Sequence, residues 1–317
     1  MKSKLLVVFM ALLLIFIAFP NVRTALIGKI DGWGRQNDTE KTEEISGVMG
    51  SSVTIDRVHI TGEAAVLMDE KTGQILFAKN ENKRLYPAST TKIMTALIAL
   101  EKGNPEDKVT VGNEVELKEK GESTAFLYEG QVITLEQLLQ GLMLPSGNDA
   151  ARTISIYIAR KVSGNERMSD KTAMAYFVRL MNVRAEKLGA KNTHFVNPNG
   201  LHSPNHYSTA SDLAKIARAA MKRSDFQQIV GQDVYKDRAV TYRNTNELLN
   251  PDSDYYYQGA NGIKTGYTDE AGSCLVSSAR HGANRLMAVV LKSTKKDIWK
   301  DSISLLDNGF AKVLASK

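Results

Sequence analysis

The stretch YPASTTKIMTALIALEKG, residues 86–103, places Ser89 three positions ahead of Lys92, where an apolar helix is expected to begin. The apolar run Ile93–Leu100 ends shortly before Gly103, which is typical of a buried helix with a glycine C-cap. Serine is a common helix N-cap, so capping alone would explain Ser89. However, residues three apart on a helix share a face, and an amine whose pKa is lowered by desolvation or a nearby cation can take a hydroxyl proton. The stretch therefore predicts either a helix cap or a serine nucleophile with Lys92 as its base.

Two further motifs follow in the order that S-x-x-K enzymes require, a second hydroxyl-plus-amide element and then a K-T-G strand. Ser146-Gly147-Asn148 comes after the apolar run LLQGLMLP, and Lys264-Thr265-Gly266 comes before the strand-like segments of the last third. Three duplicates of these patterns also occur: Lys71-Thr72-Gly73, Ser163-Gly164-Asn165 and Ser293-Thr294-Lys295-Lys296. The first precedes Ser89 in an expected hairpin turn, the second opens a polar loop between helices, and the third follows every other element. One ordered set remains, which favours Ser89 as a nucleophile.

The order of the other segments predicts the fold class. The runs AAVLMD (64–69) and QILFAK (74–79) are strand-like and are joined by EKTG, a hairpin signal. We therefore expect an α/β (α+β) domain in which helices flank an antiparallel sheet and a helical lobe is inserted. The further elements are expected as helices within 135–221, strands at 271–280 and 284–293, and a helix at 297–314.

Composition excludes several classes of function. The 317 residues are 43% hydrophobic and 24% charged, with a net charge of +6 and no basic stripe of the kind that binds nucleic acid. Cys274 is the only cysteine, so no internal disulfide can form, and the five histidines never form HExxH. His202 and His206 have helical spacing, but Pro204 lies between them. We expect no metal, no cofactor and no nucleic-acid partner.

The N-terminus predicts export. Lys2 and Lys4 precede the apolar run Leu5–Phe19, which suits a signal-peptide core or a short membrane anchor. No small-x-small cleavage site is evident and no cysteine follows, so a lipoprotein anchor is not expected. The predicted location is extracytoplasmic, either associated with the cell membrane through this segment or secreted to the cell wall. The expected parts are a signal peptide or membrane anchor (1–27), a polar linker (28–60) and a catalytic domain (61–317).

Four stretches carry a resemblance to a known family: PASTTKIMTAL, MLPSGNDAA, VNPNGLHSPNHYSTASDLA and GIKTGYTDEAGSCLVSSA. They resemble the D-alanyl-D-alanine carboxypeptidases, which are low-molecular-weight penicillin-binding serine peptidases. The likeness runs from about Ala64 to Phe310. It implies a β-lactamase/transpeptidase-like fold, peptidoglycan stem peptides ending in D-Ala-D-Ala as substrates, and covalent binding of β-lactam antibiotics such as penicillin.

The resemblance also implies roles for the first two motifs. Ser89 would attack the carbonyl between the two D-alanines, and Lys92 would accept its proton. Lys264 would help to keep Lys92 neutral. Ser146 and Asn148 would relay the proton toward the leaving amine and hold Lys92 and the substrate in place.

The third motif is expected to bind substrate. Lys264 and Thr265 would meet the terminal carboxylate, and Gly266 lies beside them in the motif. The backbone N–H groups of Ser89 and Tyr267 would form the oxyanion hole.

Two departures from the family pattern bear on function. Family members often carry an arginine shortly before the last helix that assists carboxylate binding, but the matching STKKDIWKD (293–301) has none. Carboxylate recognition is then expected to rest on Lys264 and Thr265 or on one lysine of this segment. Many relatives also continue into a β-rich domain and a C-terminal anchor, so the N-terminal segment is expected to hold the membrane here. The three lysines of the stretch 293–301 are Lys295, Lys296 and Lys300.

Two other functions are compatible with the same elements. A class A-like β-lactamase would need a glutamate that activates water. Glu247 lies only seventeen positions before Lys264, so we interpret it as structural. A non-catalytic penicillin-sensing or wall-binding protein would not need the complete set of catalytic side chains.

Several residues near the motifs have less specific interpretations. Tyr255–Tyr257 either line a substrate groove or pack as a loop, and Cys274 is expected to be a small buried residue. Asp149 and Arg152 are expected to be helix-start and surface charges. Ser208 or Thr209 is expected to cap the next helix.

Overall fold

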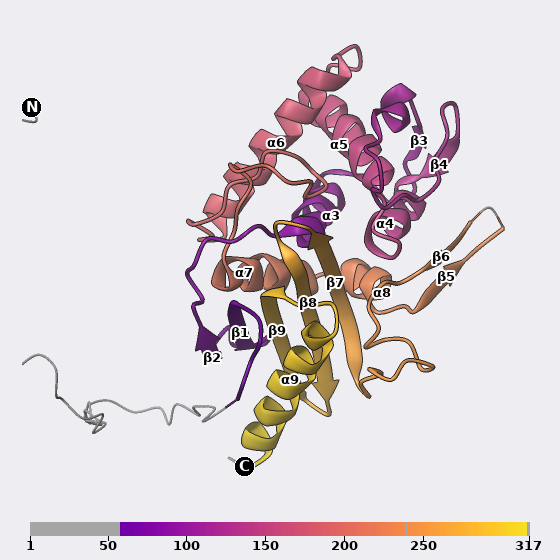
Figure 1. Ribbon diagram of the computed structural model, residues 1–317. Coiled ribbons are helices and arrows are strands. Elements are labelled where there is room, and N and C mark those ends of the chain that lie inside the picture. The colour runs from indigo at the N-terminus through magenta and orange to yellow at the C-terminus, as the bar shows by residue number, and fades with distance from the viewer. Residues whose placement is uncertain (1–57, 239, 316–317) are drawn as a thin grey trace, which may run out of the picture. The chain divides into compact units, whose positions relative to one another are not determined.

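The computed structural model describes residues 58–238 and 240–315, and a five-stranded antiparallel sheet is its central element (Figure 1). The strands lie in the order β2-β1-β9-β8-β7, so the first described strand pairs with the last. The predicted segment 1–27 and most of the linker 28–60 lie outside the described residues. The strands are β1 (Ala64–Asp69), β2 (Ile75–Lys79), β7 (Ala260–Thr268), β8 (Gly272–His281) and β9 (Asn284–Ser293).

Helices cover both faces of this sheet. The C-terminal helix α9 (Asp297–Ala315) contacts β1, β8 and β9 on one face, and α7 (Ala210–Met221) contacts the same strands on the other (Figure 1). Alternate residues of β1 divide between the two cores, since Val66 packs in the cluster with α7 and Leu67 in the cluster with α9. Because both faces are covered, β1, β8 and β9 are buried along most of their length.

A helical lobe is inserted between β2 and β7, as the sequence predicted (Figure 1). It packs on the buried helix α3 (Lys92–Lys102), which also contacts α7. The helices of this middle region are α4 (Leu135–Met143), α5 (Asn148–Ser163), α6 (Asp170–Lys187) and α8 (Ser224–Val230). The short elements that the sequence did not predict, besides α8, are β3 (Lys108–Thr110), η2 (Asn113–Leu117), β4 (Val132–Thr134), β5 (Val234–Lys236) and β6 (Thr241–Arg243).

Local chemistry explains where these elements begin and end. Thr209 caps α7 by accepting a hydrogen bond from the amide of Asp212, which confirms one of the two expected caps. Gly103 is the C-cap of α3, also as expected. Gly73 adopts a positive φ of 82° in the turn between β1 and β2, where a side chain would be strained.

The expectation that Ser89 might serve as a helix cap is wrong. A 3-10 turn, η1 (Ala88–Thr91), precedes α3, whose N-cap residue is Thr91. No side chain makes a capping hydrogen bond at the start of either element. The Ser89 hydroxyl is therefore free for another purpose.

Among the described residues, no helix has the length and apolar character needed to span a bilayer.

Candidate active site

Ser89 lies on a turn that two glycines, Gly200 and Gly266, approach closely. The preceding residue, Ala88, has a φ of 46°, which is uncommon for a residue with a side chain. A Cβ at Gly200 would lie 1.9 Å from the carbonyl oxygen of Ala88, and one at Gly266 would lie 2.9 Å from the amide nitrogen of Ser89. Only glycine allows the loop that contains Gly200 and the end of β7 that contains Gly266 to approach the backbone of Ala88 and Ser89 this closely. The close approach fixes the position of the Ser89 backbone.

The side-chain nitrogen of Lys92 has three oxygen neighbours. It lies 2.9 Å from Ser89 Oγ, and it donates hydrogen bonds to Asn148 Oδ1 at 2.6 Å and to the carbonyl oxygen of Asn199 at 2.8 Å. The amide and carbonyl oxygens can only accept, so they occupy both N–H groups of a neutral amine. The remaining lone pair then faces the Ser89 hydroxyl. This geometry suits a neutral Lys92 that accepts the proton of Ser89.

Burial favours the neutral form. Lys92 is 0% exposed, and its pKa lies well below its usual range because burial desolvates the ammonium and the charge of Lys264 repels it. The carboxylates of Glu122 and Asp149 oppose this effect. Lys264 is itself 1% exposed, and burial lowers its pKa to about 7. The two buried lysines thus suit different charge states at neutral pH.

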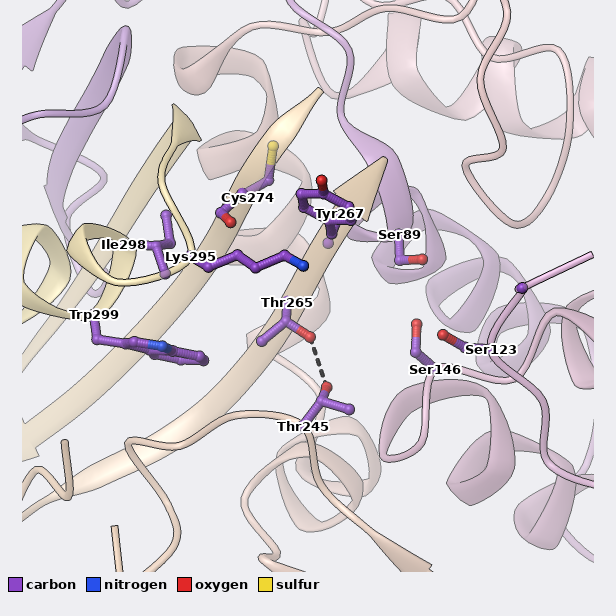
Figure 2. A pocket seen from close by; sticks show the side chains of 13 residues that line it. Ser89, Ser123, Ser146, Thr245, Thr265, Tyr267, Cys274, Lys295, Ile298 and Trp299 are labelled. Atoms are coloured by element: carbon purple, nitrogen blue, oxygen red, sulfur yellow. Dashed lines mark hydrogen bonds between the residues drawn. The ribbon is translucent and has the colours of Figure 1, made fainter. Parts of the chain in front are cut away.

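The second motif enters the site from the loop between α4 and α5. Ser146 has a φ of 66°, so its backbone adopts the left-handed conformation next to Gly147. A Cβ at Gly147 would lie 2.8 Å from the amide nitrogen of Ala125, so this position requires glycine. Figure 2 shows the hydroxyls of Ser146 and Ser123 entering the cleft from the side of the helical lobe.

A buried ion pair lies behind Asn148, and sequence reasoning missed it. Arg152 donates two hydrogen bonds to Glu122, at 3.1 and 2.7 Å, and the two side chains are 5% and 3% exposed. Asn148 Nδ2 also donates to Glu122, at 3.2 Å. Burial acts to raise the pKa of Glu122, but the hydrogen bonds from Arg152 and Asn148 outweigh it and lower the pKa. The carboxylate therefore orients the amide, so that its Oδ1 faces Lys92.

The prediction that Asp149 and Arg152 are surface charges is wrong, because both are buried. The Asp149 carboxylate accepts hydrogen bonds from the hydroxyl of Thr124 and from the amides of Ala125 and Leu127. These bonds hold the segment that carries Glu122 against the start of α5. Their partners are 22 to 25 residues away in sequence, so no local signal indicated them.

The cleft beside Ser89 has two arms, and Figure 2 shows the first of them. The first, about 380 Å³, extends toward Lys295, Ile298 and Trp299 at the start of α9. The second, about 400 Å³, extends past Gly200 and His202 toward the loop after β7. Both arms include Ser89 and Tyr267 in their lining, so a bound chain can pass across the nucleophile from one arm to the other.

The third motif forms one wall of the first arm. Thr265 Oγ1 lies 2.6 Å from Thr245 Oγ1 and accepts a long hydrogen bond of 3.5 Å from the buried Lys264 ammonium. Tyr267 lies at the rim with its ring exposed. β7 is the edge strand of the described sheet, and both η1 and α8 contact it. The structure thus brings together all eight predicted site residues at one cleft: Ser89, Lys92, Ser146, Asn148, Lys264, Thr265, Gly266 and Tyr267.

None of the duplicate motifs reproduces the site, although Lys295 of the third one lines the first arm of the cleft. Ser163 is exposed at the end of α5, Lys71 lies in the β1–β2 turn, and the Ser293 hydroxyl donates to Asp301. Glu247 lines neither arm of the cleft, and its carboxylate accepts a hydrogen bond from the side-chain amide of Asn250. Within the described ranges, no group of three or more His, Cys, Asp or Glu side chains could hold a metal ion.

The aromatic run before β7 packs as a loop. Tyr257 donates its hydroxyl to Asp307 on α9, and Tyr255 stacks on Trp299. None of the three tyrosines lines the cleft. Cys274 is buried, as expected, and forms part of the floor of the first arm.

A serine that lines the cleft beside a buried lysine, between a helical lobe and the edge strand of an antiparallel sheet, defines the class of S-x-x-K active-site serine enzymes. Within that class, the chain belongs to the D-alanyl-D-alanine carboxypeptidase family (Peptidase_S11), whose sequence profile matches residues 51–295. The family predicted from the four stretches is confirmed.

Individual relatives support the same family assignment. The chain is 38% identical over 262 residues to D-alanyl-D-alanine carboxypeptidase DacF of Bacillus subtilis, covering 78% of this chain and 62% of that relative. It is 34% identical to a D-alanyl-D-alanine carboxypeptidase of Streptomyces sp. strain K15, covering 84% and 94%. The chain thus spans less than two thirds of DacF but nearly all of the Streptomyces relative.

Solved structures confirm the predicted fold class. The Streptomyces K15 DD-transpeptidase superposes with a TM-score of 0.75 at 34% identity, covering 81% of this chain and all of that one. Penicillin binding protein 6B of Escherichia coli superposes with a TM-score of 0.72 at 34% identity, covering 84% and 81%.

Proposed function

We propose that this chain is a serine-type D-Ala-D-Ala carboxypeptidase that removes the terminal D-alanine from peptidoglycan stem peptides through an acyl-enzyme at Ser89. The observation that carries the proposal is the arrangement around Lys92, where two acceptors occupy the N–H groups of the neutral amine and Ser89 Oγ lies 2.9 Å away. Membership of the carboxypeptidase family supports the substrate class.

Acylation follows from this geometry. Ser89 Oγ attacks the carbonyl carbon between the two D-alanines while its proton passes to Lys92. The backbone N–H groups of Ser89 and Tyr267 stabilise the oxyanion that forms. When the C–N bond breaks, the proton passes through the Ser146 hydroxyl to the leaving amine, and free D-alanine departs. Asn148 holds Lys92 in place during these transfers.

Deacylation returns the enzyme to its starting state. Water attacks the ester carbonyl and gives a proton to Lys92, which returns it to Ser89 Oγ as the ester bond breaks, and the shortened peptide leaves. An amine in place of water would give transpeptidation, and relatives carry both names, carboxypeptidase and DD-transpeptidase.

The two arms of the cleft take different parts of the substrate. The first arm contains the Thr265 hydroxyl, with the Lys264 ammonium beside it, and suits the terminal carboxylate. The second arm then takes the peptide that precedes the D-alanines. A β-lactam antibiotic with its own carboxylate presents its amide carbonyl to Ser89 in the same way and forms a covalent adduct.

We also propose that the domain acts outside the cytoplasm and is held at the membrane by the segment 1–27. Membrane fractionation of the full chain should find it mostly with the membrane. A mature protein that begins near residues 20 to 30 and is released into the medium would contradict the membrane anchor and would instead support secretion of a cleaved protein.

Release of D-alanine from a peptide ending in D-Ala-D-Ala tests the catalytic proposal. The full chain should release one D-alanine per peptide, and Ser89→Ala should release none. A wild-type protein that binds penicillin but releases no D-alanine would instead support a penicillin-sensing role.

A further inference from the structure

A pocket of about 520 Å³ lies apart from the active-site cleft, and we call it the basic pocket. Four cationic side chains line it: Lys71 in the β1–β2 turn, Lys222 after α7, and Arg280 and Arg285 at the β8–β9 hairpin. β8 runs from Cys274 in the first arm of the cleft to Arg280, a distance of about 20 Å along the strand. The basic pocket is therefore separate from the active site.

Most of these cations lack an ionic partner. Lys71, Lys222 and Arg280 form no ion pair with any carboxylate in the part of the chain that the structure describes. Arg285 Nη1 lies 3.9 Å from Glu70 Oε1, at the outer limit of an ion pair. Glu70 is the only acidic residue among the described residues that line the pocket. An anion that enters the pocket would therefore be attracted by several cations without breaking a close ion pair.

The two arginines of the basic pocket repel each other. Arg280 and Arg285 are directly opposite in the register of β8 and β9, so their side chains leave the same face of the sheet. Like charges at directly opposite positions destabilise a pair of strands. Nε of Arg280 also donates to the carbonyl oxygen of Gly282 at 2.8 Å, which holds this guanidinium at the hairpin. An anion bound between the two arginines would relieve the repulsion.

Glu70 distinguishes the basic pocket from an ordinary solvated surface. The residue is only 7% exposed, and its Oε2 is buried without a hydrogen-bond partner among the described residues. Burial raises the pKa of this carboxyl, while the charge of Arg285 acts in the opposite direction. Buried polar atoms are usually paired, because an unpaired one has lost its hydrogen bonds to water. A ligand that places a hydroxyl donor at Oε2 would supply the missing bond.

We propose that the basic pocket binds a phosphorylated polyol, with the phosphate on the arginines and lysines and a hydroxyl group donating to Glu70. A phosphate monoester carries up to two negative charges and three acceptor oxygens, so it suits several cations better than a carboxylate does. The guanidinium groups of Arg280 and Arg285 offer planar forks of N–H donors that match phosphate oxygens. The volume of the pocket is typical of small-molecule sites. This binding is independent of the catalytic activity.

Calorimetric titration of the full chain in non-ionic detergent tests the proposal with three probes: glycerol phosphate, inorganic phosphate and glycerol. Glycerol phosphate should bind more tightly than inorganic phosphate, because only the former brings both groups, and glycerol alone should not bind. Arg280→Ala should weaken the binding of glycerol phosphate by about 10- to 100-fold, the loss expected for a hydrogen bond to a charged group. The control Arg167→Ala removes an exposed arginine between α5 and α6 and should bind as wild type. A wild type that does not bind glycerol phosphate, or wild-type affinity in Arg280→Ala, would overturn the proposal.

The phosphate can come from a soluble polyol phosphate or from a lipid headgroup, and vesicles distinguish the two sources. Co-sedimentation is compared for the wild type and Arg280→Ala with vesicles of phosphatidylglycerol and of phosphatidylcholine. Weaker sedimentation of the variant with phosphatidylglycerol alone assigns the pocket to the headgroup. Equal sedimentation of the two proteins, together with the calorimetric loss, assigns it to a soluble polyol phosphate.

A second variant, Glu70→Leu, separates the hydroxyl contact from the phosphate contact. Leucine replaces the buried carboxylate by an apolar side chain of similar size, so the variant should fold. It should bind inorganic phosphate at least as tightly as the wild type, because a negative charge has been removed from the pocket. It should also bind glycerol phosphate no more tightly than inorganic phosphate, because the acceptor for the hydroxyl is gone. A variant that keeps the wild-type preference for glycerol phosphate would overturn the role of Glu70.

Discussion

At the scale of single residues, the environment of Lys92 distinguishes its role from that of Lys264. Lys92 needs a lone pair to accept a proton, and its two acceptor neighbours leave that lone pair facing Ser89. Lys264 has a hydroxyl neighbour, Thr265, and needs only positive charge to attract a carboxylate. The two buried lysines should therefore respond differently to the same substitution.

Replacement by arginine keeps the charge but removes the base, because arginine does not lose its proton in proteins. Lys92→Arg should lower the rate of acylation by about 10²–10⁴-fold, the usual contribution of a general base. Lys264→Arg should keep part of the activity. The rate of penicillin acylation measures both effects, and wild-type acylation by Lys92→Arg would exclude its role as base.

The pH dependence of kcat/KM should have two limbs. Activity rises with pH as Lys92, whose pKa is lowered, loses its proton and becomes a base. Activity falls above about pH 7, because Lys264, with a pKa of about 7, loses the charge that binds the carboxylate. In Lys264→Arg the charge persists, so the alkaline limb should move to higher pH. An alkaline limb that does not move would mean that another group controls it.

At the scale of elements, the nucleophile turn depends on the two glycines that flank it. Gly200→Ala would place Cβ 1.9 Å from a backbone oxygen, so the turn must shift. A misplacement of about 1 Å can cost about 10²-fold in rate, and we expect a loss of that order in penicillin acylation. The matched control is Gly164→Ala, which also has a positive φ but no atom within 4 Å of the added Cβ. Similar acylation rates in the two variants would contradict this account of the turn.

The Glu122–Arg152 pair couples α5 to the segment before it. Arg152→Ala leaves Glu122 buried without its partner, which should lower the free energy of unfolding by about 3–5 kcal/mol. Lys161→Ala removes the surface ion pair with Asp107 and should cost about 0–1 kcal/mol. Urea unfolding compares the two variants. Equal losses would show that burial does not determine the strength of the first pair.

At the scale of the whole molecule, the sequence predicted elements better than their contacts. The run 64–69 and the run 284–293 match β1 and β9, because strand periodicity and flanking turns are local signals. Their pairing with each other, across more than 200 residues, has no local signal. The short strands β3 to β6 have three residues each, too few for a periodic pattern, and they pair only within two-stranded sheets, while α8 packs on α4, α7 and β7.

In the active site, too, the sequence predicted the residues of the motifs better than it predicted their contacts. The three motifs identified Ser89 and its partners because their spacing reflects the chemistry itself. Asn199 contributes through its backbone carbonyl, which no side-chain pattern reveals. Arg152 seemed a surface charge because its partner Glu122 lies thirty residues earlier. Of Lys295, Lys296 and Lys300, only Lys295 lines the cleft, and no local signal in the sequence separates it from the other two.

Mass spectrometry of a penicillin-treated digest tests the central claim most directly. The account predicts a persistent covalent adduct on the peptide that contains Ser89, since Glu247, the glutamate that superficially resembles the water-activating residue of a β-lactamase, lines neither arm of the cleft. Ser89→Ala should lose both the adduct and D-alanine release while it remains folded, and Ser163→Ala should keep both. An adduct on any other residue, or rapid turnover of the drug, would contradict the assignment of Ser89 as the nucleophile of a carboxypeptidase.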